Sequence, residues 1–500
     1  MVRKFDTKRT KIVCTIGPAS SDEVIIREMI RAGMDVARIN FSHGDYQTHG
    51  ANIALIRRVA VEEGAIVAIL GDLQGPKIRL GKIANEPISL EKGDHLTLTT
   101  READGSNMIF PLPHPEFVKD VKAGHRLLLD DGQLEFKVIG KQNNGDLVCE
   151  VVIGGPLSSR KGISAPESKL TLSAITDKDR EDVKFALEQK VDYIAMSFVR
   201  SGNDMRELRW LCRHLEGDVA LISKIEKREA IENIDDIIEA SDGVMVARGD
   251  LGVETPAEAV PIHQKEIIRR CNAVGKPVIT ATQMLNSMIF SPRPTRAEAS
   301  DVANAIFDGT DAVMLSGETA SGKYPVIAVE TMATIAMIAE THLKEDARAG
   351  LGRTQLSFKG MELVSDATSA AASQIAEELG AKLIVTATWT GYTSRQVART
   401  RPVTPILCVT PNEETYRRMA MVWGVLPIMV PEFSSVDEML EKIVQTAYDA
   451  RLVEYGDLLV IIAGLPFGAG GHTNFLKIHT VGEGGEVTER AVAEQPVNAE

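Results

Sequence analysis

Short hydrophobic runs rich in Val, Ile and Met recur along the chain, and each is followed by a stretch with helical periodicity. Continuous apolar runs of this length are typical of parallel strands buried on both faces, joined by crossover helices. Such runs occupy residues 11–16, 35–40, 65–72, 192–198, 219–226, 243–250, 277–282 and 311–316. Eight strands alternating with helices predict an α/β fold of the TIM (β/α)8 barrel type.

Polar side chains stand at the C-terminal ends of these predicted strands. They are Arg38, Asn40, Asp72, Lys224, Glu226, Asp250, Thr282, Ser316 and Glu318. TIM barrels form their active sites at this face, because the carboxyl ends of all eight strands meet there. The pattern therefore predicts a catalytic site rather than a purely structural barrel.

The pattern changes over residues 75–171, where short alternating segments such as HLTLTT and LEFKVI are separated by Gly and Asp. This stretch is too long for one crossover helix and predicts an inserted small β-barrel. Placed over the catalytic end of the barrel, the insertion could act as a lid that excludes water.

A second α/β region follows a polar, Gly-containing stretch. Its predicted strands cover residues 382–388, 405–409, 426–430, 458–463 and 475–480. The expected organisation is a TIM-barrel catalytic domain (1–74 and 172–343), a lid (75–171), a linker (344–360), a C-terminal α/β regulatory domain (361–480) and a mobile acidic tail (481–500).

Composition narrows the class of partner. The formal net charge of −14 and the pI near 5.4 argue against nucleic acid or an acidic membrane surface, which select for basic proteins. The five cysteines are odd in number and lack CxxC spacing, so neither a disulfide framework nor a thiolate metal site is expected. No signal-peptide pattern and no run of about 18 uncharged apolar residues is present, which predicts a soluble, cytoplasmic protein.

The segment SKIE places Lys224 and Glu226 two residues apart on one strand, so both side chains point to the same side. A surface ion pair is the alternative, but perturbed groups gather at a barrel's catalytic rim. In VMVARGDLGVE, the strand ends at Gly249 and Asp250, whose amides suit a carboxylate, and Asp250 can hold a metal. The alternative is that Asp250 only caps a helix.

Two further segments carry charge at strand ends. VARINFSHGD offers the Arg38 guanidinium for phosphate beside Asn40, Ser42 and His43, of which His43 is interpreted as an orienting or capping residue. GDLQGPKIR adds Asp72, Lys77 and Arg79 at the hinge into the lid. Hinge charges of this kind can also be ordinary solvated surface.

GETASGKY, from Gly317 to Tyr324, nearly matches the P-loop pattern, but Tyr324 stands where the metal-binding hydroxyl belongs. A P-loop NTPase is therefore rejected. The segment follows the eighth strand, where barrels commonly bind phosphate. Thr282 and Ser316 complete the seventh and eighth strands, and both can equally be ordinary strand-end hydroxyls.

Taken in order, these segments resemble the pyruvate kinase family over almost the whole chain. The resemblance rests on KIVCTIGPAS, MDVARINFSHG, GDLQGPKIR, SKIE, VMVARGDLGVE, TATQMLNSM, PRPTRAE and MLSGETASGKYP. It implies a kinase that transfers the phosphoryl group of phosphoenolpyruvate to ADP, giving pyruvate and ATP in the last step of glycolysis. It also implies a homotetramer.

The resemblance also implies roles for individual residues. Glu226 and Asp250 would bind the Mg²⁺ or Mn²⁺ ion, and Lys224 would stabilise charge on the phosphoryl group and the enolate oxygen. The substrate and nucleotide positions would be Arg38, Asn40, His43, Arg79, Lys161, Gly249, Asp250 and Thr282. Thr282 and Ser316 would lie near the enolate carbon and help deliver a proton.

One position departs from part of the family. Many members have an acidic residue where this chain has Lys77. They bind K⁺ at positions matching Asn40, Ser42, Asp72 and the carbonyl of Leu73. The resemblance is to the bacterial type with lysine at this position, and no K⁺ requirement is expected.

The segment TATWTGYTSR in the C-terminal region follows a predicted strand and opens a helix. Its candidate phosphate-binding residues are Thr388, Thr390, Gly391, Thr393 and Ser394. Regulated pyruvate kinases bind an activating phosphate at a similar segment, under a loop matching residues 464–472. Trp389 and Tyr392 replace cations of members that respond to fructose 1,6-bisphosphate, so a sugar monophosphate or AMP is the expected activator. A Thr-rich helix cap is the alternative.

Two rival classes make different demands on the sequence. A barrel aldolase or lyase acting on a pyruvate enolate would also use Glu226, Asp250 and a lysine, but it would need neither lid nor nucleotide. A regulatory protein with a decayed site would have lost some of these charges, and none is missing.

Overall fold

A closed barrel of eight parallel strands forms the centre of the protein. The computed structural model describes residues 8–348, 363–466 and 472–482. The barrel strands are β1 (Lys11–Thr15), β2 (Val36–Asn40), β3 (Ala68–Asp72), β12 (Tyr193–Met196), β13 (Ala220–Ile225), β14 (Gly243–Ala247), β15 (Val278–Ala281) and β16 (Ala312–Leu315). Strand β1 pairs with both β2 and β16, which closes the barrel and confirms the predicted fold.

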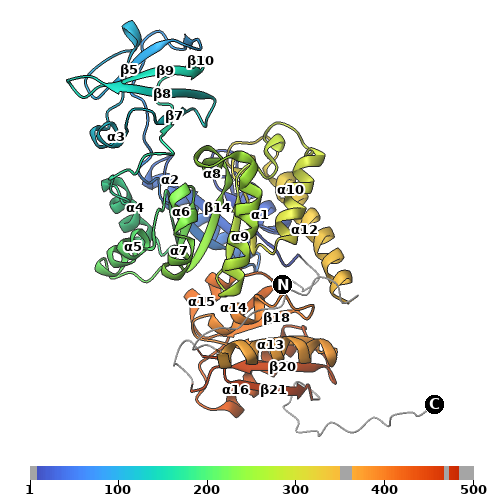
Figure 1. Cartoon of the computed structure of the whole chain (residues 1–500). Helices are drawn as coiled ribbons and strands as arrows, with labels where there is room; N and C mark the ends of the chain where they lie inside the picture. Colours follow the sequence, from blue (N-terminus) through green and yellow to red (C-terminus); the bar gives the residue numbers. More distant parts are fainter. Residues whose placement is uncertain (1–7, 349–362, 467–471, 483–500) are drawn as a thin grey trace.

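Helices that follow the barrel strands in the sequence surround the barrel (Figure 1). They are α1 (Glu23–Ala32), α2 (Tyr46–Glu62), α4 (Asp177–Glu188), α5 (Gly202–His214), α6 (Arg228–Glu232), α7 (Ile234–Ala240), α8 (Arg248–Glu254), α9 (Val260–Ala273), α10 (Arg296–Phe307), α11 (Gly317–Ala320) and α12 (Pro325–Arg348). Capping boxes start α4 at Thr176 with Asp179 and α10 at Thr295 with Glu298, because each pair satisfies two otherwise free amides.

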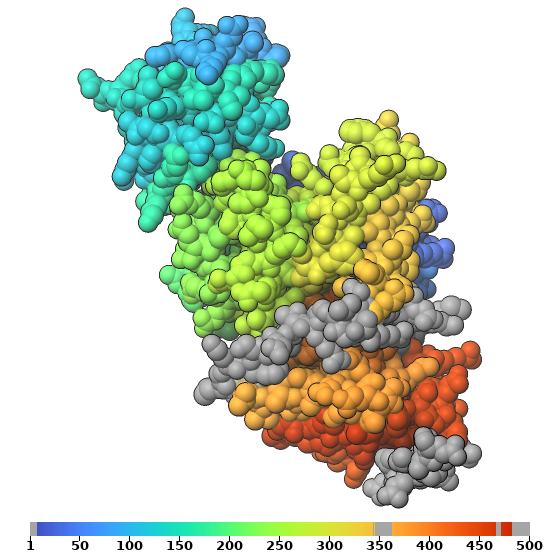
Figure 2. Space-filling view, turned by 45° about the vertical axis from the view of Figure 1, so that its right-hand side comes forward, coloured from blue at the N-terminus to red at the C-terminus, as the bar shows by residue number. Residues whose placement is uncertain are grey.

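The lid follows β3 and consists of two small sheets around one core. Its elements are β4 (Ile88–Leu90), β5 (His95–Thr99), β6 (Ile109–Pro111), α3 (Pro115–Asp120), β7 (Arg126–Leu129), β8 (Leu134–Lys141), β9 (Leu147–Ile153), β10 (Gly155–Leu157) and β11 (Ile163–Ser164). Figures 1 and 2 show it at one end of the molecule, beyond the barrel. The expected inserted β domain is therefore present.

The C-terminal domain has a five-stranded sheet in the order β19-β18-β17-β20-β21, with only β21 antiparallel. Its elements are α13 (Leu363–Glu378), β17 (Leu383–Ala387), α14 (Tyr392–Ala398), β18 (Ile406–Thr410), α15 (Glu413–Arg418), β19 (Val425–Met429), α16 (Val436–Asp449), β20 (Leu458–Ala463) and β21 (Phe475–Thr480). Residues 349–360 of the expected linker, 467–471 of the expected effector loop and 483–500 of the tail lie outside the described residues.

Four aspartates line the end of the barrel opposite the lid. Each stands directly before a barrel strand, and together they are Asp35, Asp192, Asp242 and Asp311. The carboxylate of each accepts a backbone N–H from the first or second residue of the preceding barrel strand, at 2.7 to 3.0 Å. Asp192 also binds Arg417, and Asp311 binds Arg401, both from the C-terminal domain. The C-terminal domain is thus docked by charge onto the floor of the barrel, away from the catalytic end.

One helix is long and apolar enough, by composition alone, to cross a membrane: the Pro325–Leu343 part of α12. In this structure that helix packs against α1 and α10 on the outside of the barrel. Core helices of soluble proteins can have the same length and composition, so one such helix gives little support for a membrane span.

Candidate active site

The ammonium of Lys224 lies at the C-terminal mouth of the barrel, where β13 ends. Its Nζ is 2.9 Å from Oε1 of Glu226, 3.3 Å from Oδ1 of Asp72 and 2.7 Å from Oγ of Ser197. Burial lowers the pKa of Lys224, but the charges of Asp72 and Glu226 outweigh burial and raise the pKa above its usual value. The side chain, 11% exposed, is therefore a largely buried cation that stays charged.

Arg38 adds a second cation at the same mouth. Its Nε donates to Oδ2 of Asp72 at 2.6 Å, and its Nη1 donates to Oγ1 of Thr15 at 2.9 Å. Burial raises the pKa of Asp72, but the charges of Lys224 and Arg38 more than compensate and lower it overall. One ionised carboxylate thus holds both cations, although β3 and β12 separate the strand of Arg38 from the strand of Lys224.

Glu226 is buried, with 1% of its side chain exposed, and is held from two sides. Oε1 forms the ion pair with Lys224, while Oε2 accepts the backbone N–H of Phe198 at 2.6 Å. Burial raises the pKa of Glu226, and the nearby charge of Asp250 raises it further against the effect of Lys224. A bound cation would lower the pKa of Glu226 again, because it stabilises the ionised form of both carboxyl groups.

Strand β14 ends at Ala247, earlier than expected, and Gly249 and Asp250 lie in the first turn of α8 rather than on the strand. The Gly249 N–H donates to Oγ1 of Thr282 at 2.8 Å. Thr282 has a φ of 70°, a conformation unusual for a β-branched residue. The amide of Gly249, a candidate ligand of the substrate carboxylate, is therefore hydrogen-bonded to the Thr282 hydroxyl.

The carboxylates of Glu226 and Asp250 fit a hard divalent cation. No group of three or more His, Cys, Asp and Glu side chains suited to a metal occurs within the described ranges. Two carboxylates are nevertheless the usual protein share of a Mg²⁺ site, since Mg²⁺ keeps several waters and binds substrate phosphates. The donor set therefore agrees with the expected Mg²⁺ or Mn²⁺.

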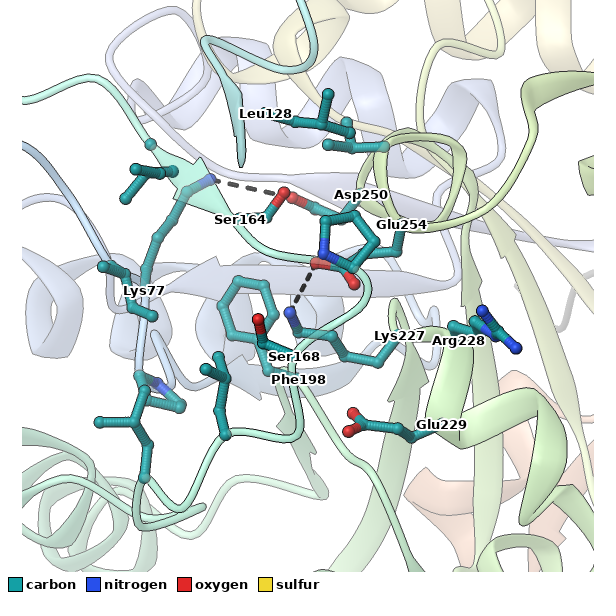
Figure 3. Close-up of a pocket in the computed structure, with 18 of the residues that line it drawn as sticks. Lys77, Leu128, Ser164, Ser168, Phe198, Lys227, Arg228, Glu229, Asp250 and Glu254 are labelled. Carbon is teal, nitrogen blue, oxygen red and sulfur yellow. Dashed lines mark hydrogen bonds and ion pairs between the residues drawn. The ribbon is translucent and has the colours of Figure 1, made fainter. Parts of the chain in front are cut away.

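The expected monovalent-cation positions are engaged with protein groups. Oδ1 of Asn40 accepts the Ser42 N–H at 3.1 Å, and the Leu73 carbonyl accepts the Ser197 hydroxyl at 2.7 Å. The Lys77 ammonium is 3.9 Å from Oδ1 of Asp250 (Figure 3). Lys77 therefore pairs with an expected metal ligand.

No hydrogen bond or ion pair within the described ranges joins the His43 side chain to this charged group. The side chain of His43 is exposed, and its backbone N–H donates to the Asn40 carbonyl at 3.3 Å. This position agrees with an orienting or capping residue.

Lid residues line a cavity with barrel residues on the catalytic side. Ser164 and Ser168 line it from the lid, and Lys227 and Glu254 line it from the barrel (Figure 3). Lys227 and Glu254 form an ion pair with each other. Figure 2 shows the molecule hollowed between the lid and the barrel. Lys77 and Asp250 line the same cavity, so two of the candidate site residues border it.

Two expected phosphate and nucleotide ligands are bound within the lid region. Lys161 forms an ion pair with Asp130 at 2.8 Å, and Nη1 of Arg79 donates to the Arg160 carbonyl at 3.1 Å. The structure therefore does not bring Lys161 or Arg79 into contact with Lys224.

Ser316 caps the short helix α11 after β16, and its backbone N–H donates to Oε2 of Glu318 at 2.7 Å. Oε1 of the same glutamate accepts the Leu285 N–H at 3.1 Å. Glu318 thus ties the segment that follows the seventh strand to the end of the eighth strand. These two hydrogen bonds give Glu318 a structural role at the end of the strand, so no catalytic role is needed to explain its position.

The expected effector residues surround the start of α14. The Gly391 N–H donates to Oγ1 of Thr388 at 3.0 Å, and Gly391 has a φ of 76°. Thr390 is exposed, whereas the Thr393 hydroxyl is buried against that of Thr473. Ser394 is fully buried and bonds to Thr386, so its hydroxyl points into the sheet and away from any surface ligand.

Sequence reasoning missed Ser197 and Phe198, which contact Lys224 and Glu226. They end DYIAMSF, the fourth barrel run, and a serine at a strand end is the same signal that identified Ser316. The contact of the Phe198 amide had no signal, because any residue supplies a backbone N–H.

Known proteins match this chain along most of its length. A family model described as "Pyruvate kinase, barrel domain" matches residues 7–329, and one described as "Pyruvate kinase, alpha/beta domain" matches residues 366–479. A pyruvate kinase of Geobacillus stearothermophilus is 48% identical, and one of Staphylococcus saprophyticus is 47% identical. Each alignment covers 95% of this chain and 81% of the relative.

Proposed function

This chain belongs to the pyruvate kinase family, and from that membership we propose that it transfers the phosphoryl group of phosphoenolpyruvate to ADP in the cytoplasm, as the last step of glycolysis. The observation that carries the proposal is the Lys224 ammonium, held between Asp72 and Glu226 at the barrel mouth. Phosphoryl transfer proceeds through a loose transition state whose oxygens carry negative charge. A fixed, buried cation is what such a reaction requires.

The proposed division of labour follows from the charges. Lys224 faces the transferring phosphoryl group and the enolate oxygen, while Arg38 on β2 holds phosphate. The amides of Gly249 and Asp250 hold the substrate carboxylate. The Thr282 hydroxyl accepts from Gly249 and donates to the Ala281 carbonyl in this structure, so contact with substrate requires it to exchange these bonds. Thr282 and Ser316 help to deliver the proton that converts the enolate to pyruvate.

The lid residues Lys161 and Arg79 complete the site on the nucleotide side. Both are held by lid groups, Asp130 and the Arg160 carbonyl respectively. Their roles therefore require the lid to approach the barrel when nucleotide binds. Such closure also removes the water that would compete with ADP for the phosphoryl group.

Glu226 and Asp250 are proposed to hold the divalent cation, Mg²⁺ or Mn²⁺. When bound, it supplies positive charge that neutralises phosphate oxygens and helps to position them. The protein prepares this site by burying Glu226 and fixing its two oxygens with Lys224 and Phe198. Asp250 stays partly exposed and can approach substrate and solvent ligands.

The direct test is to mix the purified protein with phosphoenolpyruvate and Mg²⁺, with and without ADP, and to measure pyruvate and ATP. We expect pyruvate only when ADP is present. Substantial pyruvate turnover without ADP, or cleavage of pyruvate-derived 2-oxo acids, would favour the rival lyase class and contradict a kinase.

We predict that the enzyme works without K⁺. The Lys77 ammonium supplies a tethered positive charge, paired with Asp250 in this structure, whereas members with an acidic residue at this position depend on a mobile cation. Assays with tetramethylammonium as the only monovalent cation should retain most of the activity measured in K⁺. Strong activation of the wild type by K⁺ would refute the prediction.

The reverse substitution tests the cause. Lys77→Glu should create a K⁺ requirement when assayed at saturating Mg²⁺, because the new carboxylate also lies beside Asp250. Lys82→Glu makes the same charge change at an exposed lid residue and serves as the matched control. A K⁺ response that is equal in both variants would assign the effect to overall charge.

We also predict activation by a sugar monophosphate or AMP at the start of α14. Thr388, Thr390 and Gly391 remain the proposed contacts, while the buried hydroxyls of Thr393 and Ser394 support the loop through Thr473 and Thr386. The activator should lower the half-saturating phosphoenolpyruvate concentration by about fivefold or more, with little change in maximum rate. Saturation curves with glucose 6-phosphate, ribose 5-phosphate, AMP and fructose 1,6-bisphosphate measure this shift.

Thr390→Glu should abolish the response, because a carboxylate repels the phosphate. Thr368→Glu, on α13 of the same domain, is the control and should keep it. The prediction fails if only the bisphosphate activates, or if Thr390→Glu responds like the wild type.

A homotetramer is proposed from family membership and from apolar side chains exposed on the barrel. Ile262, Phe290 and Ile338 are each at least 66% exposed. Light scattering that gives the mass of a single chain would contradict this assembly.

A further inference from the structure

Ser197 connects the catalytic lysine to the neighbouring strand. It follows β12 directly, is 3% exposed, and has no role in the proposed mechanism so far. Its Oγ donates to the Leu73 carbonyl at 2.7 Å and accepts from the Lys224 Nζ at the same distance. A serine hydroxyl carries one proton, so donation to Leu73 turns its lone pairs toward the ammonium.

One hydrogen bond, to Ser197, and two ion pairs, with Asp72 and Glu226, hold the Lys224 ammonium. Asp72 comes from the end of β3, Ser197 from the end of β12 and Glu226 from just after β13. The two carboxylates supply attraction, which is long-ranged and tolerates displacement. The neutral Ser197 hydroxyl supplies a directional contact, which is lost when the ammonium moves.

The backbone around Ser197 is held in an unusual shape that serves the same pair of residues. Phe198 has a φ of 56°, rare for a bulky side chain, and this bend presents its N–H to Oε2 of Glu226. A Cβ atom at Gly75 would lie 2.9 Å from Cβ of Ser197. Only a glycine at position 75 therefore leaves room for this segment.

We propose that Ser197 is a positioning residue that aims the Lys224 ammonium at the transferring phosphoryl group. This inference rests on the proposed function, since it assumes that Lys224 acts on that group. Ser197 does not contact the reacting atoms in this account. It acts only through Lys224.

Ser197→Ala should lower kcat by about 10- to 100-fold, the range expected when a supporting contact misplaces a catalytic group. The Michaelis constant for phosphoenolpyruvate should change little, because both carboxylates still hold the charge in the site. Ser223→Ala is the matched control. Ser223 precedes Lys224 on β13, is fully buried, and its Oγ has no hydrogen-bond partner among the described residues. Its substitution should leave kcat unchanged.

A double-mutant cycle separates positioning from a general structural effect. Ser197→Ala should cause no further loss in a Lys224→Met background, measured as [³²P]ATP formed in incubations of hours. Ser197→Cys, nearly equal in size but a poor acceptor, should reproduce the loss if the alanine variant folds badly.

Three results separate this inference from the proposed function. A kcat for the Ser197 variants equal to that of Ser223→Ala overturns the positioning role. Equal losses in the wild-type and Lys224→Met backgrounds overturn it as well, because Ser197 would then act independently of Lys224. Wild-type protein that forms no ATP from phosphoenolpyruvate and ADP overturns the proposed function itself.

Discussion

Lys224→Met should lower kcat by about 10³-fold or more, the lower end of the range for removing a cation that stabilises a phosphoryl-transfer transition state. Methionine keeps much of the length and apolar volume of the side chain but removes the charge between Asp72 and Glu226. The affinity for phosphoenolpyruvate should fall much less, because the loss concerns charge that develops in the transition state. Steady-state kinetics and equilibrium binding of phosphoenolpyruvate to the same preparation measure the two effects.

Stability has to be controlled in this experiment. Removing one partner of a buried ion pair costs about 3–5 kcal/mol, since the other charge stays buried without compensation. Lys8→Met breaks the comparably buried pair with Asp35 at the opposite end of the barrel, so it tests the same loss of stability outside the proposed site. Its kcat should stay close to that of the wild type. Near-normal turnover of Lys224→Met would exclude Lys224 as the catalytic cation.

Glu226→Gln and Asp250→Asn should each raise the half-saturating Mg²⁺ concentration at least about tenfold, because even losing a supporting group around a metal has costs of that order. Amide oxygens are weaker ligands than carboxylates for hard cations. In Glu226→Gln, the new side-chain amide would also turn an N–H donor toward either Lys224 or the Phe198 N–H, both of which are donors. Titration of activity with Mg²⁺ and with Mn²⁺ measures the effect.

Glu254→Gln provides the control for the metal titration. Glu254 is also a buried carboxyl group whose pKa is raised by burial, but it pairs with Lys227 and is not a proposed ligand. Its substitution should leave the metal midpoint close to that of the wild type. If Glu226→Gln and Asp250→Asn both titrate like the wild type, the ligand assignment is wrong.

Most of the residues at the mouth of the barrel could be predicted because the hydrophobic pattern indicates where each strand lies and where it ends. Apolar runs with helices between them specify a parallel barrel, and a barrel brings the ends of all its strands to one mouth. Arg38, Asp72, Lys224 and Glu226 were found in this way, and they share direct contacts. The five strands of the C-terminal sheet follow from the same pattern.

Contacts that depend on local backbone geometry could not be predicted. The start of α8 at Arg248 moves Gly249 and Asp250 off the strand, and no periodicity marks such a short turn. Burial of Ser394 depends on which side of α14 faces the sheet. The contact between Lys77 and Asp250 joins the hinge to a distant strand end, so sequence spacing carries no information about it.

The most direct test of the central claim follows phosphorus from donor to acceptor. ³¹P NMR of wild-type protein with phosphoenolpyruvate, ADP and Mg²⁺ should show the donor resonance replaced, in equal amount, by the γ-phosphate of ATP. Lys224→Met at the same concentration should leave the donor resonance almost unchanged over that time. Release of inorganic phosphate in place of ATP, or equal transfer by the two proteins, would contradict phosphoryl transfer to ADP assisted by Lys224.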